Sequence, residues 1–491
     1  MTSKKPGKKN TAKNSFELIN IRWRKIKNKF IITNDFGYYL SLNQKEFNDL
    51  IYKNKVSEKL KEELISKGFI KTHMDFDDLF SRWKNSNSYL FWGPSLHILV
   101  TTLRCNHKCV YCQSQAVGIS NDKTDMPTSI AKKSVDIAFY STAPVLTFEF
   151  QGGEPLYNWE TVSKAIKYIR EKEKHSDKKI NISIVSNFSV MDEKKAKFLM
   201  ENEVSICTSL DGPEKLHNKN RIYTQANSYR ETIKWLKYFN SMHDNQTNLS
   251  YRIFKPSALT TISCDSLKYH KEIIDEFVKN DLNTIFLRPL SPIGFAKKMW
   301  NKIGYDSKSF LKFYKDSLNY ILSLNKKGID IKEKTAIMLL NKILNAKDSG
   351  FVDLRCPCGA GIGQVAYNHN GDIYTCDEGR MVGWEGEDIF KIGTVKDSYK
   401  KIINSLTTRT CAITSNLENQ FTCSRCAYRP YCGVCPVINY ESQNDIWGNN
   451  LSSERCKIFM GIFDIIFELM EDPKNMEIFN SWVEDKKEIT V

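Results

Sequence analysis

The sequence predicts an α/β fold built around a partial (β/α)6 barrel, with a small N-terminal module and a Cys-rich C-terminal region. Six β-rich segments recur between residues 95 and 290, segments with helical spacing separate them, and short Gly- and Cys-rich segments follow residue 351. Strands that alternate with helices form a parallel sheet with crossover helices. Six such units predict an open, TIM-like barrel rather than a closed eightfold one.

The composition is that of a globular protein with several domains. The chain has 491 residues, of which 41% are hydrophobic and 12% aromatic, so it can bury a large core. Residues 1–14 form a basic tail without an apolar segment behind it, and no apolar run approaches the roughly 18 residues of a membrane span. We therefore expect a cytoplasmic protein with no membrane contact. Its net charge of +15 is otherwise interspersed, so we do not expect nucleic acid as the partner.

The N-terminal module is expected over residues 15–85. In KFIITNDFGYYLSLNQ two strand-like runs flank the turn signal Asn34–Gly37, which predicts a hairpin. Two segments with helical spacing follow, and Gly68 ends the second. A hairpin with adjoining helices predicts a winged-helix-like module that is separate from the barrel.

The barrel is expected over residues 95–310, with its functional groups where the strands end. The strands are predicted at residues 96–103, 146–153, 181–187, 205–211, 249–262 and 284–290. Barrels of this kind carry their active groups at the carboxyl ends of the strands. Three cysteines follow the first strand, Gly152–Pro155 end the second, Ser186 the third and Asp211 the fourth. A helical bridge over 311–350, a Cys-rich domain over 351–456 and a helical segment over 457–491 complete the chain.

The fourteen cysteines point to metal or cluster ligation, because a chain without a secretion signal is not expected to form a disulfide framework. Cys105, Cys109 and Cys112 lie in TLRCNHKCVYCQ, eight more between residues 356 and 456 form a second set, and Cys207, Cys264 and Cys411, the last of them within that range, stand apart from both sets. A single zinc ion needs a fourth ligand, for which His107 is the candidate within the same tight loop. A four-iron four-sulfur (4Fe-4S) cluster instead takes three thiolates and keeps one iron open.

The C-x3-C-x2-C loop, with Tyr111 before its third cysteine and the strand-end motifs after it, resembles the radical S-adenosylmethionine (SAM) superfamily. The resemblance implies that a 4Fe-4S cluster on the three cysteines binds SAM, whose reductive cleavage releases a 5′-deoxyadenosyl radical. It implies that the methionine amino group is bound by Gly152, Gly153 and Glu154. It also implies contacts to the SAM ribose or carboxylate from Ser186, Asp211 and Arg221.

The later cysteines resemble the SPASM extension of peptide-modifying radical SAM enzymes, which carries two auxiliary 4Fe-4S clusters. The resemblance implies that the first is held by Cys358, Cys376 and Cys435, with Cys356 as the fourth ligand, and the second by Cys423, Cys426, Cys432 and Cys456. The sequence departs from the family in the two residues between Cys432 and Cys435 and in the short Cys356–Cys358 spacing. The alternative for the CxxC pairs is a structural zinc ribbon. Either way, we expect ligands rather than a core to hold this region together.

Asp377 directly follows Cys376. In related sulfatase-maturing enzymes an Asp at this place removes a substrate proton, which makes Asp377 the candidate general base. The alternative is a structural loop acid.

The N-terminal module resembles the PqqD-like elements that bind a leader peptide as an added strand. The expected edge lies within Lys29–Ser41, and the alternative is a plain cap on the barrel.

These features predict a radical SAM/SPASM maturase that crosslinks or oxidises a side chain of a ribosomally made precursor peptide. CGAGIGQVAYNHNGDIYTCDEGRM and TLRCNHKCVYCQ most resemble the maturase of His-Xaa-Ser repeat peptide systems, which implies a second radical SAM maturase as partner. Flavodoxin or ferredoxin is the expected reductant. The alternatives are a sulfatase-type maturase that makes formylglycine, and a zinc-dependent nucleic-acid-binding protein, which the basic tail and CxxC pairs would also suit.

Overall fold

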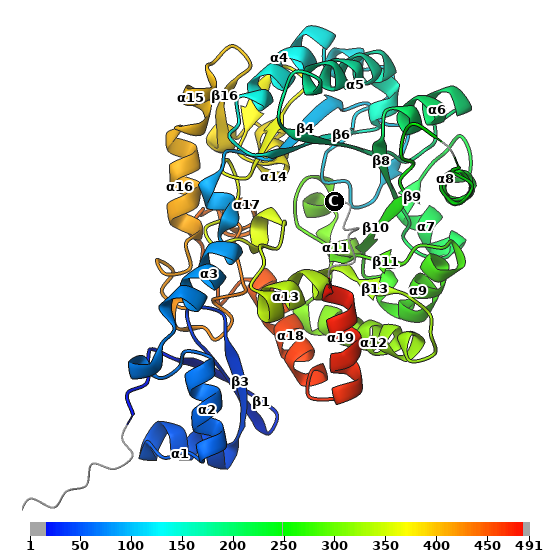
Figure 1. Ribbon diagram of the computed structural model, residues 1–491. Coiled ribbons are helices and arrows are strands. Elements are labelled where there is room, and N and C mark those ends of the chain that lie inside the picture. The colour runs from blue at the N-terminus through cyan, green and yellow to red at the C-terminus, as the bar shows by residue number, and fades with distance from the viewer. Residues whose placement is uncertain (1–15, 248, 485–491) are drawn as a thin grey trace, which may run out of the picture.

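The computed structural model describes residues 16–247 and 249–484 (Figure 1). The predicted basic tail and the last residues of the predicted C-terminal segment lie outside the described residues. None of the helices in the described ranges has the length and apolar character needed to cross a membrane.

The N-terminal module lies at the lower left of Figure 1, apart from the barrel. Its antiparallel sheet has the order β1 (Arg22–Ile26), β2 (Lys29–Thr33), β3 (Tyr39–Asn43), and it is followed by α1 (Gln44–Lys53), α2 (Glu58–Ser66) and α3 (Phe76–Ser86). The predicted hairpin is β2–β3. Strand β1 was not predicted from the sequence, because Arg22, Arg24 and Lys25 hide its half-buried alternation. The predicted edge is therefore wrong for Lys29–Thr33, which form the central strand.

This module is attached to the C-terminal helix α18 (Glu454–Leu469), which is followed by the last helix, α19 (Pro473–Val483). Arg24 on β1 donates from Nε and Nη2 to the two carboxylate oxygens of Asp464 at 2.5 and 2.6 Å. Tyr428 donates its hydroxyl to Asp464 Oδ1 at 2.6 Å. Asp464 thus joins the N-terminal module, the Cys-rich region and α18 at one point.

We expect Asp464→Asn to loosen this attachment. The change removes the charge that accepts both guanidinium bonds, and hydrogen bonds to charged groups contribute about 1.5 kcal/mol or more. Hydrogen exchange of the β1–β3 amides should therefore become faster, while exchange in the barrel strands stays as it is. The control is Asp316→Asn, which removes an exposed ion pair with Lys312 on the barrel side. Equal exchange in both variants would refute the attachment through Asp464.

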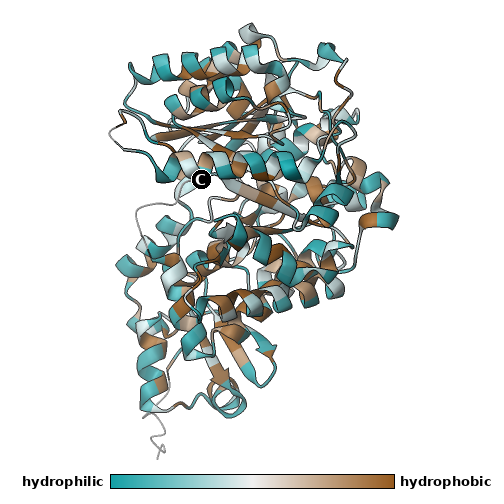
Figure 2. Cartoon of the chain, turned by 90° about the vertical axis from the view of Figure 1, so that its right-hand side faces the viewer, coloured by the Kyte–Doolittle hydropathy of each residue, from teal (hydrophilic) through white to brown (hydrophobic). Residues whose placement is uncertain are grey.

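The barrel contains the predicted six-stranded parallel sheet. The strand order is β12 (Leu287–Pro289), β10 (Ser257–Ile262), β8 (Val204–Ser209), β7 (Lys179–Val185), β6 (Val145–Gly152), β4 (Leu96–Thr102). The strand predicted over residues 249–262 begins only at Ser257. Figure 2 shows brown, hydrophobic strands flanked by helices whose outer faces are largely teal, that is, hydrophilic. The helices that follow the barrel strands in the sequence are α4 (Thr128–Phe139), α5 (Trp159–Glu173), α6 (Glu193–Glu201), α7 (Glu214–Asn220), α8 (Ser228–Asp244) and α9 (His270–Lys279).

The Cys-rich region continues the barrel sheet. β14 (Gln364–Tyr367) pairs in parallel with β4, with Gln364 opposite Leu96, and β15 (Asp372–Tyr374) and β16 (Lys391–Thr394) extend the sheet antiparallel. Around them, a buried cluster includes Tyr374, Val382 and Phe390. The expectation that this region lacks a core is therefore wrong: it shares the barrel sheet and has a core of its own.

The remaining elements connect these parts. The helices are α10 (Phe295–Lys298), α11 (Trp300–Ile303), α12 (Ser307–Asn325), α13 (Lys334–Asn345), α14 (Asp377–Trp384), α15 (Tyr399–Ile403), α16 (Leu406–Ser415) and α17 (Pro436–Gln443). The short strands are β5 (Lys108–Cys109), β9 (Arg221–Ile222), β11 (Thr284–Ile285) and β13 (Lys332–Glu333), paired as β5–β9 and β11–β13.

Candidate active site

A cavity of about 180 Å³ lies where the barrel strands end, and Cys105, Cys109 and Cys112 line it together. The loop that carries them follows β4, and the short β5–β9 pair sets Cys109 opposite Arg221. The other strand ends meet at the same cavity and contribute Gly152, Gly153, Ser186, Asn187, Ser209, Thr261 and Arg288. Three thiols therefore share one space with polar groups from five other strands.

Gly152 and Gly153 bring the end of β6 against the cysteine loop. Gly152 has a φ of 140°, and a Cβ there would lie 2.1 Å from the carbonyl oxygen of Thr102. A Cβ on Gly153 would lie 2.3 Å from the carbonyl oxygen of Arg104. The Gly153 amide donates to Thr102 O at 2.8 Å. The two glycines thus allow backbone to pack on backbone directly beside the cavity.

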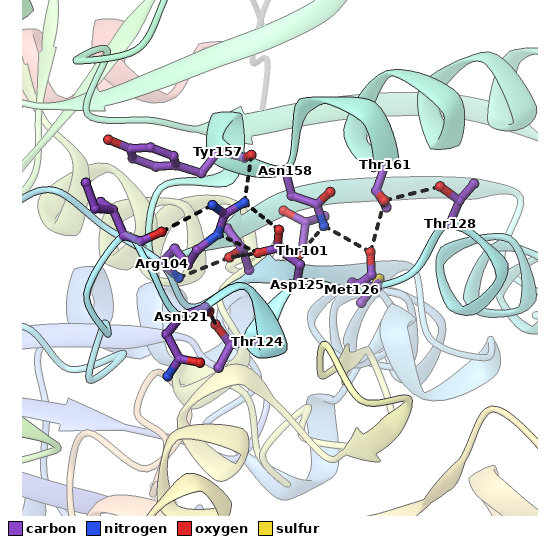
Figure 3. Close-up of polar contacts among 12 residues, drawn as sticks. Thr101, Arg104, Asn121, Thr124, Asp125, Met126, Thr128, Tyr157, Asn158 and Thr161 are labelled. Carbon is purple, nitrogen blue, oxygen red and sulfur yellow. Dashed lines mark hydrogen bonds and ion pairs between the residues drawn. The ribbon is translucent and has the colours of Figure 1, made fainter.

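A second layer of polar contacts fixes the same loop (Figure 3). Arg104 forms an ion pair with Asp125 and donates to the carbonyl oxygen of Tyr157 at 3.0 Å. Asn158 donates to the carbonyl oxygens of Thr101 and Met126 at 2.8 and 2.9 Å. These contacts were not predicted from the sequence. Arg104, a charged residue directly before the first cysteine, was the only local signal.

Glu154 lies behind the cavity wall rather than in it. Its side chain is fully buried and accepts hydrogen bonds from Ser186 Oγ at 2.8 Å and from the Asn187 amide at 2.7 Å. Burial raises the pKa of Glu154 to about 7, although these hydrogen bonds oppose the shift. Ser186 and Asn187 line the cavity, whereas Glu154 is not among the lining residues. Its carboxylate therefore orients two residues that face the cavity.

Asp211 also supports the wall from behind, through Tyr111. The Tyr111 hydroxyl donates to Asp211 Oδ2 at 2.5 Å, and Arg221 Nη1 donates to the Tyr111 oxygen at 3.1 Å. Burial raises the pKa of Asp211, and the charge of Arg221 opposes this shift. Tyr111 and Arg221 line the cavity. Of the predicted SAM contacts, the lining therefore includes Gly152, Gly153, Ser186 and Arg221.

His107 is engaged by protein groups at both ring nitrogens. Nε2 lies 2.9 Å from Ser228 Oγ, and Nδ1 lies 2.9 Å from Asn106 Oδ1 and 3.1 Å from Asn187 Nδ2. Burial lowers the pKa of His107 to about 3. Across residues 16–247 and 249–484, no three His, Cys, Asp or Glu side chains are arranged to hold a single metal ion. A 4Fe-4S cube spaces its thiolates farther apart than one tetrahedral ion does, so thiols around a cavity suit the cube.

The C-terminal cysteines fall into two groups. A second cavity, of about 40 Å³, is lined by five of the cysteines predicted as ligands: Cys423, Cys426, Cys432, Cys435 and Cys456. A buried apolar cluster contains Cys358, Cys376, Cys411 and Cys435. Burial raises the pKa of these thiols, for Cys411, Cys423 and Cys435 to about 12. Because ligands must be deprotonated, metal binding at either group would release protons.

Asp377 begins α14 and is tied to a buried cation. Its Oδ1 accepts from Arg380 Nε at 3.0 Å and Nη2 at 2.9 Å, and Arg380 is 1% exposed. Arg380 also donates to Ser114 Oγ at 3.2 Å, and Ser114 lines the first cavity. Asp377 is therefore linked to the cavity through two side chains.

The barrel interior beside Asp377 holds a second carboxyl, Glu149 on β6. Burial, and then the charge of Asp377, raises the pKa of Glu149 to about 7 from an ordinary 4.5. Between pH 4.5 and about pH 7, Glu149 is therefore protonated to a greater extent in the folded state than in the unfolded state. The free energy of unfolding should therefore fall, by roughly 2 kcal/mol, as the pH rises from 4.5 to 7.

Urea unfolding across this pH window checks the expectation on samples of equal iron content. In Glu149→Gln the free energy of unfolding should fall by roughly 2 kcal/mol less over this pH range than in wild type. In Glu160→Gln, at an exposed position of α5, it should fall as much as in wild type. Identical slopes in wild type and Glu149→Gln would rule out this source of pH dependence.

Comparisons with known proteins agree with this geometry. The model of the radical SAM superfamily matches residues 99–254. The cysteine-type anaerobic sulfatase-maturating enzyme of Clostridium perfringens is 24% identical over 357 residues, covering 70% of this chain and 89% of the relative. The radical SAM cyclopropyl synthase TigE of Paramaledivibacter caminithermalis is 24% identical over 371 residues, covering 70% and 68%.

Solved structures give the same fold. The structure of anSMEcpe with bound AdoMet and Kp18Cys peptide has a TM-score of 0.63 at 20% identity and covers 79% of this chain and 100% of its own. Streptococcus suis SuiB bound to its precursor peptide SuiA has a TM-score of 0.51 at 13% identity and covers 88% and 98%.

A radical SAM domain implies a 4Fe-4S cluster and SAM, and the first cavity fits both. Three thiols line it, leaving one iron of a cube without a protein thiolate. The buried cation Arg221 and the hydroxyls of Ser209 and Thr261 offer donors for a carboxylate and a ribose, and Ser186 Oγ, whose hydrogen goes to Glu154, offers an acceptor. The predicted fold class is confirmed: the chain contains a radical SAM domain and has the radical SAM α/β fold.

Proposed function

We propose that this radical SAM enzyme modifies a side chain of a ribosomally synthesised peptide by crosslinking or oxidation. The observation that carries the proposal is the connection of the Cys-rich region to the radical SAM domain. β14 pairs with β4, the strand that leads into the cysteine loop, and the two groups of thiols lie on both sides of β14 in the sequence, Cys358 before it and the others after it. Clusters held by these thiols would be attached to the sheet of the domain that cleaves SAM.

In this proposal the three lining cysteines hold the SAM-binding cluster, and the cluster with SAM supplies a 5′-deoxyadenosyl radical once reduced by flavodoxin or ferredoxin. Gly152, Gly153, Ser186 and Arg221 bind SAM. Glu154 and Asp211 act behind them by orienting Ser186 and Tyr111. Asp377 accepts the substrate proton, and its two contacts with the buried Arg380 hold the carboxylate in a fixed orientation.

The C-terminal groups are proposed as the two auxiliary 4Fe-4S sites. Cys358, Cys376 and Cys435 share one buried cluster, and the other group surrounds the second cavity. Buried thiols with raised pKa values are poor free nucleophiles but good ligands once an iron ion displaces the proton.

We assign leader capture to an outer strand of the N-terminal sheet, β1 or β3. Peptide addition to a sheet edge uses free backbone groups for affinity and side pockets for specificity. The SuiB structure, which contains a precursor peptide, matches 88% of this chain, against 79% for anSMEcpe. A coverage of 88% is more than residues 87–491 alone could supply, so the fold match extends into the N-terminal module. A His-Xaa-Ser repeat peptide, with a second radical SAM maturase, is the specific substrate system proposed.

The second candidate is sulfatase-type maturation, in which a Cys or Ser becomes formylglycine. The observation in its favour is the match to 89% of the length of a cysteine-type sulfatase-maturating enzyme. Both candidates need the same radical, so they differ only in the peptide and in the product.

One anaerobic experiment tests the proposal. The reconstituted protein is reduced with dithionite, given SAM, and offered two synthetic peptides, one with His-Xaa-Ser repeats behind a leader and one with a sulfatase-type cysteine. We expect 5′-deoxyadenosine together with loss of two hydrogens from the repeat peptide. Replacement of sulfur by oxygen with loss of two hydrogens, in the cysteine peptide alone, would favour the second candidate. Zinc in place of iron, with no 5′-deoxyadenosine, would favour the zinc-binding alternative.

A further inference from the structure

We propose that Cys411, and not Cys356, is the fourth protein ligand of the first auxiliary cluster. This inference rests on the auxiliary clusters of the proposed function. Cys411 stands apart from the other cysteines in the sequence, 35 residues after Cys376 and 24 before Cys435. The fold brings it into the same buried cluster as Cys358, Cys376 and Cys435.

The four side chains share one apolar enclosure. Cys358, Cys376, Cys411 and Cys435 are 2%, 3%, 3% and 6% exposed. The rest of the cluster is apolar or aromatic, with Ile293, Val382 and Phe390 among its members. A thiolate needs a metal or a cation in such surroundings, because burial alone disfavours its charge.

Helix α16 is fixed against the loop that carries Cys358. Ser415, one turn after Cys411, donates from Oγ to the Cys411 carbonyl at 2.6 Å and accepts from the Cys358 amide at 2.9 Å. Gly361 has a φ of +74°, and a Cβ there would lie 2.5 Å from Thr408 Oγ1 on the same helix. The helix can approach this closely only because that position is glycine.

The same loop contacts the segment between β15 and α14 that carries Cys376. The Gly361 amide donates to the carbonyl oxygen of Thr375 at 2.7 Å. The turn of α16 with Cys411, the Cys358 loop and the end of β15 are therefore held together by direct contacts, independently of any bound group.

Cys356 lies in different surroundings. Its Sγ accepts the Leu417 amide at 3.3 Å, and its charged neighbours are Lys342, Arg429 and Glu418. Lys342 is also a neighbour of Cys432, and Cys356 is a neighbour of Cys423. Among the described residues, the partly buried apolar side chains packed on the Cys411 cluster are Val352, Tyr440 and Ile446, without Cys356. Cys356 is thus a neighbour of the second group of thiols, although it does not line the second cavity.

The number of thiolates determines what the cluster can do. A cube with three protein ligands keeps an open iron to which a substrate can bind, whereas one with four is complete. With Cys411 as ligand, the first auxiliary cluster transfers electrons and does not bind the peptide.

The test uses the full chain with Cys105, Cys109 and Cys112 replaced by alanine, so that only auxiliary clusters remain. After anaerobic reconstitution and reduction, ¹³C-cyanide is added as a probe for an open iron and its hyperfine coupling is measured by electron-nuclear double resonance. We expect about eight irons per chain and no ¹³C coupling. Adding Cys411→Ala should produce the coupling, whereas Cys356→Ala and Cys207→Ala, a control at a half-buried position of β8, should not.

Three results would overturn the inference. A ¹³C coupling before any Cys411 change would show an open cluster, and a coupling that arises only with Cys356→Ala would make Cys356 the ligand. A triple variant that binds no iron would remove the auxiliary clusters altogether, and the proposed function with them. Retention of the second cluster in Cys411→Ala shows that the variant is folded. Cys411→Ser, which keeps the side-chain volume, should change the g-values of the reduced cluster.

Discussion

Replacement of Cys112 by alanine is expected to abolish reductive SAM cleavage. Cys112 is one of the three thiols that line the first cavity, and two thiolates leave a 4Fe-4S cube without the ligands that fix it in the loop. Mutation of residues that only contact the metal ligands lowers metal affinity or activity by about 10–100-fold. Loss of a ligand itself should therefore lower 5′-deoxyadenosine formation by more than ~100-fold. The product is quantified by chromatography after dithionite reduction under anaerobic conditions.

The matched control is Cys264→Ala. Cys264 is the thiol that donates to the Lys302 carbonyl at 3.1 Å, and it belongs to none of the three groups. This variant should keep both its iron and its rate. Cys112→Ala should lose about four irons and keep those of the auxiliary sites. An unchanged rate in Cys112→Ala would contradict the assignment of the first cavity.

Gly153→Ala should strongly destabilise the cysteine loop. The added Cβ would lie 2.3 Å from the Arg104 carbonyl oxygen and 2.6 Å from that of Leu103. Both contacts are with backbone, which cannot rotate away as a side chain can. Overpacking of this kind costs about 3 kcal/mol. We expect that loss in urea unfolding, together with slow and incomplete loading of the first cluster, because the strain falls on the cysteine loop.

Gly118→Ala is its control in the same loop. A Cβ at Gly118 meets nothing within 4 Å, so stability and iron content should stay at wild-type values. Similar stability of the two variants would mean that the end of β6 does not constrain the loop.

The elements that could be predicted from the sequence are those whose signals are local. The six barrel strands and the motifs at their ends follow from hydrophobic runs and adjacent polar residues, which is why Cys105 and Ser186 could be assigned to the same end of the sheet. β1 was missed because its inward positions are only half-buried. The first half of the predicted 249–262 strand was wrong, since an apolar run does not reveal whether a partner strand lies beside it.

Long-range pairings could not be predicted in this way. Nothing near Gln364 shows that it lies opposite Leu96, and nothing near Cys411 marks it as a neighbour of Cys358. For the same reason Glu154 was predicted to bind the amino group of SAM, although its hydrogen bonds go to Ser186 and Asn187. Residue type and spacing predicted the chemistry of the site, whereas the division between lining and supporting residues depends on tertiary packing.

The pairing of β14 with β4 also has a consequence during synthesis on the ribosome. The chain is made at about 5–20 residues per second, so β14 emerges some tens of seconds after β4. Throughout that interval one side of β4 is an open, apolar edge to which another nascent chain can add. Production of intact enzyme should therefore depend on chaperones that bind the growing chain. Truncation before residue 364 should yield an aggregating product rather than a smaller working barrel.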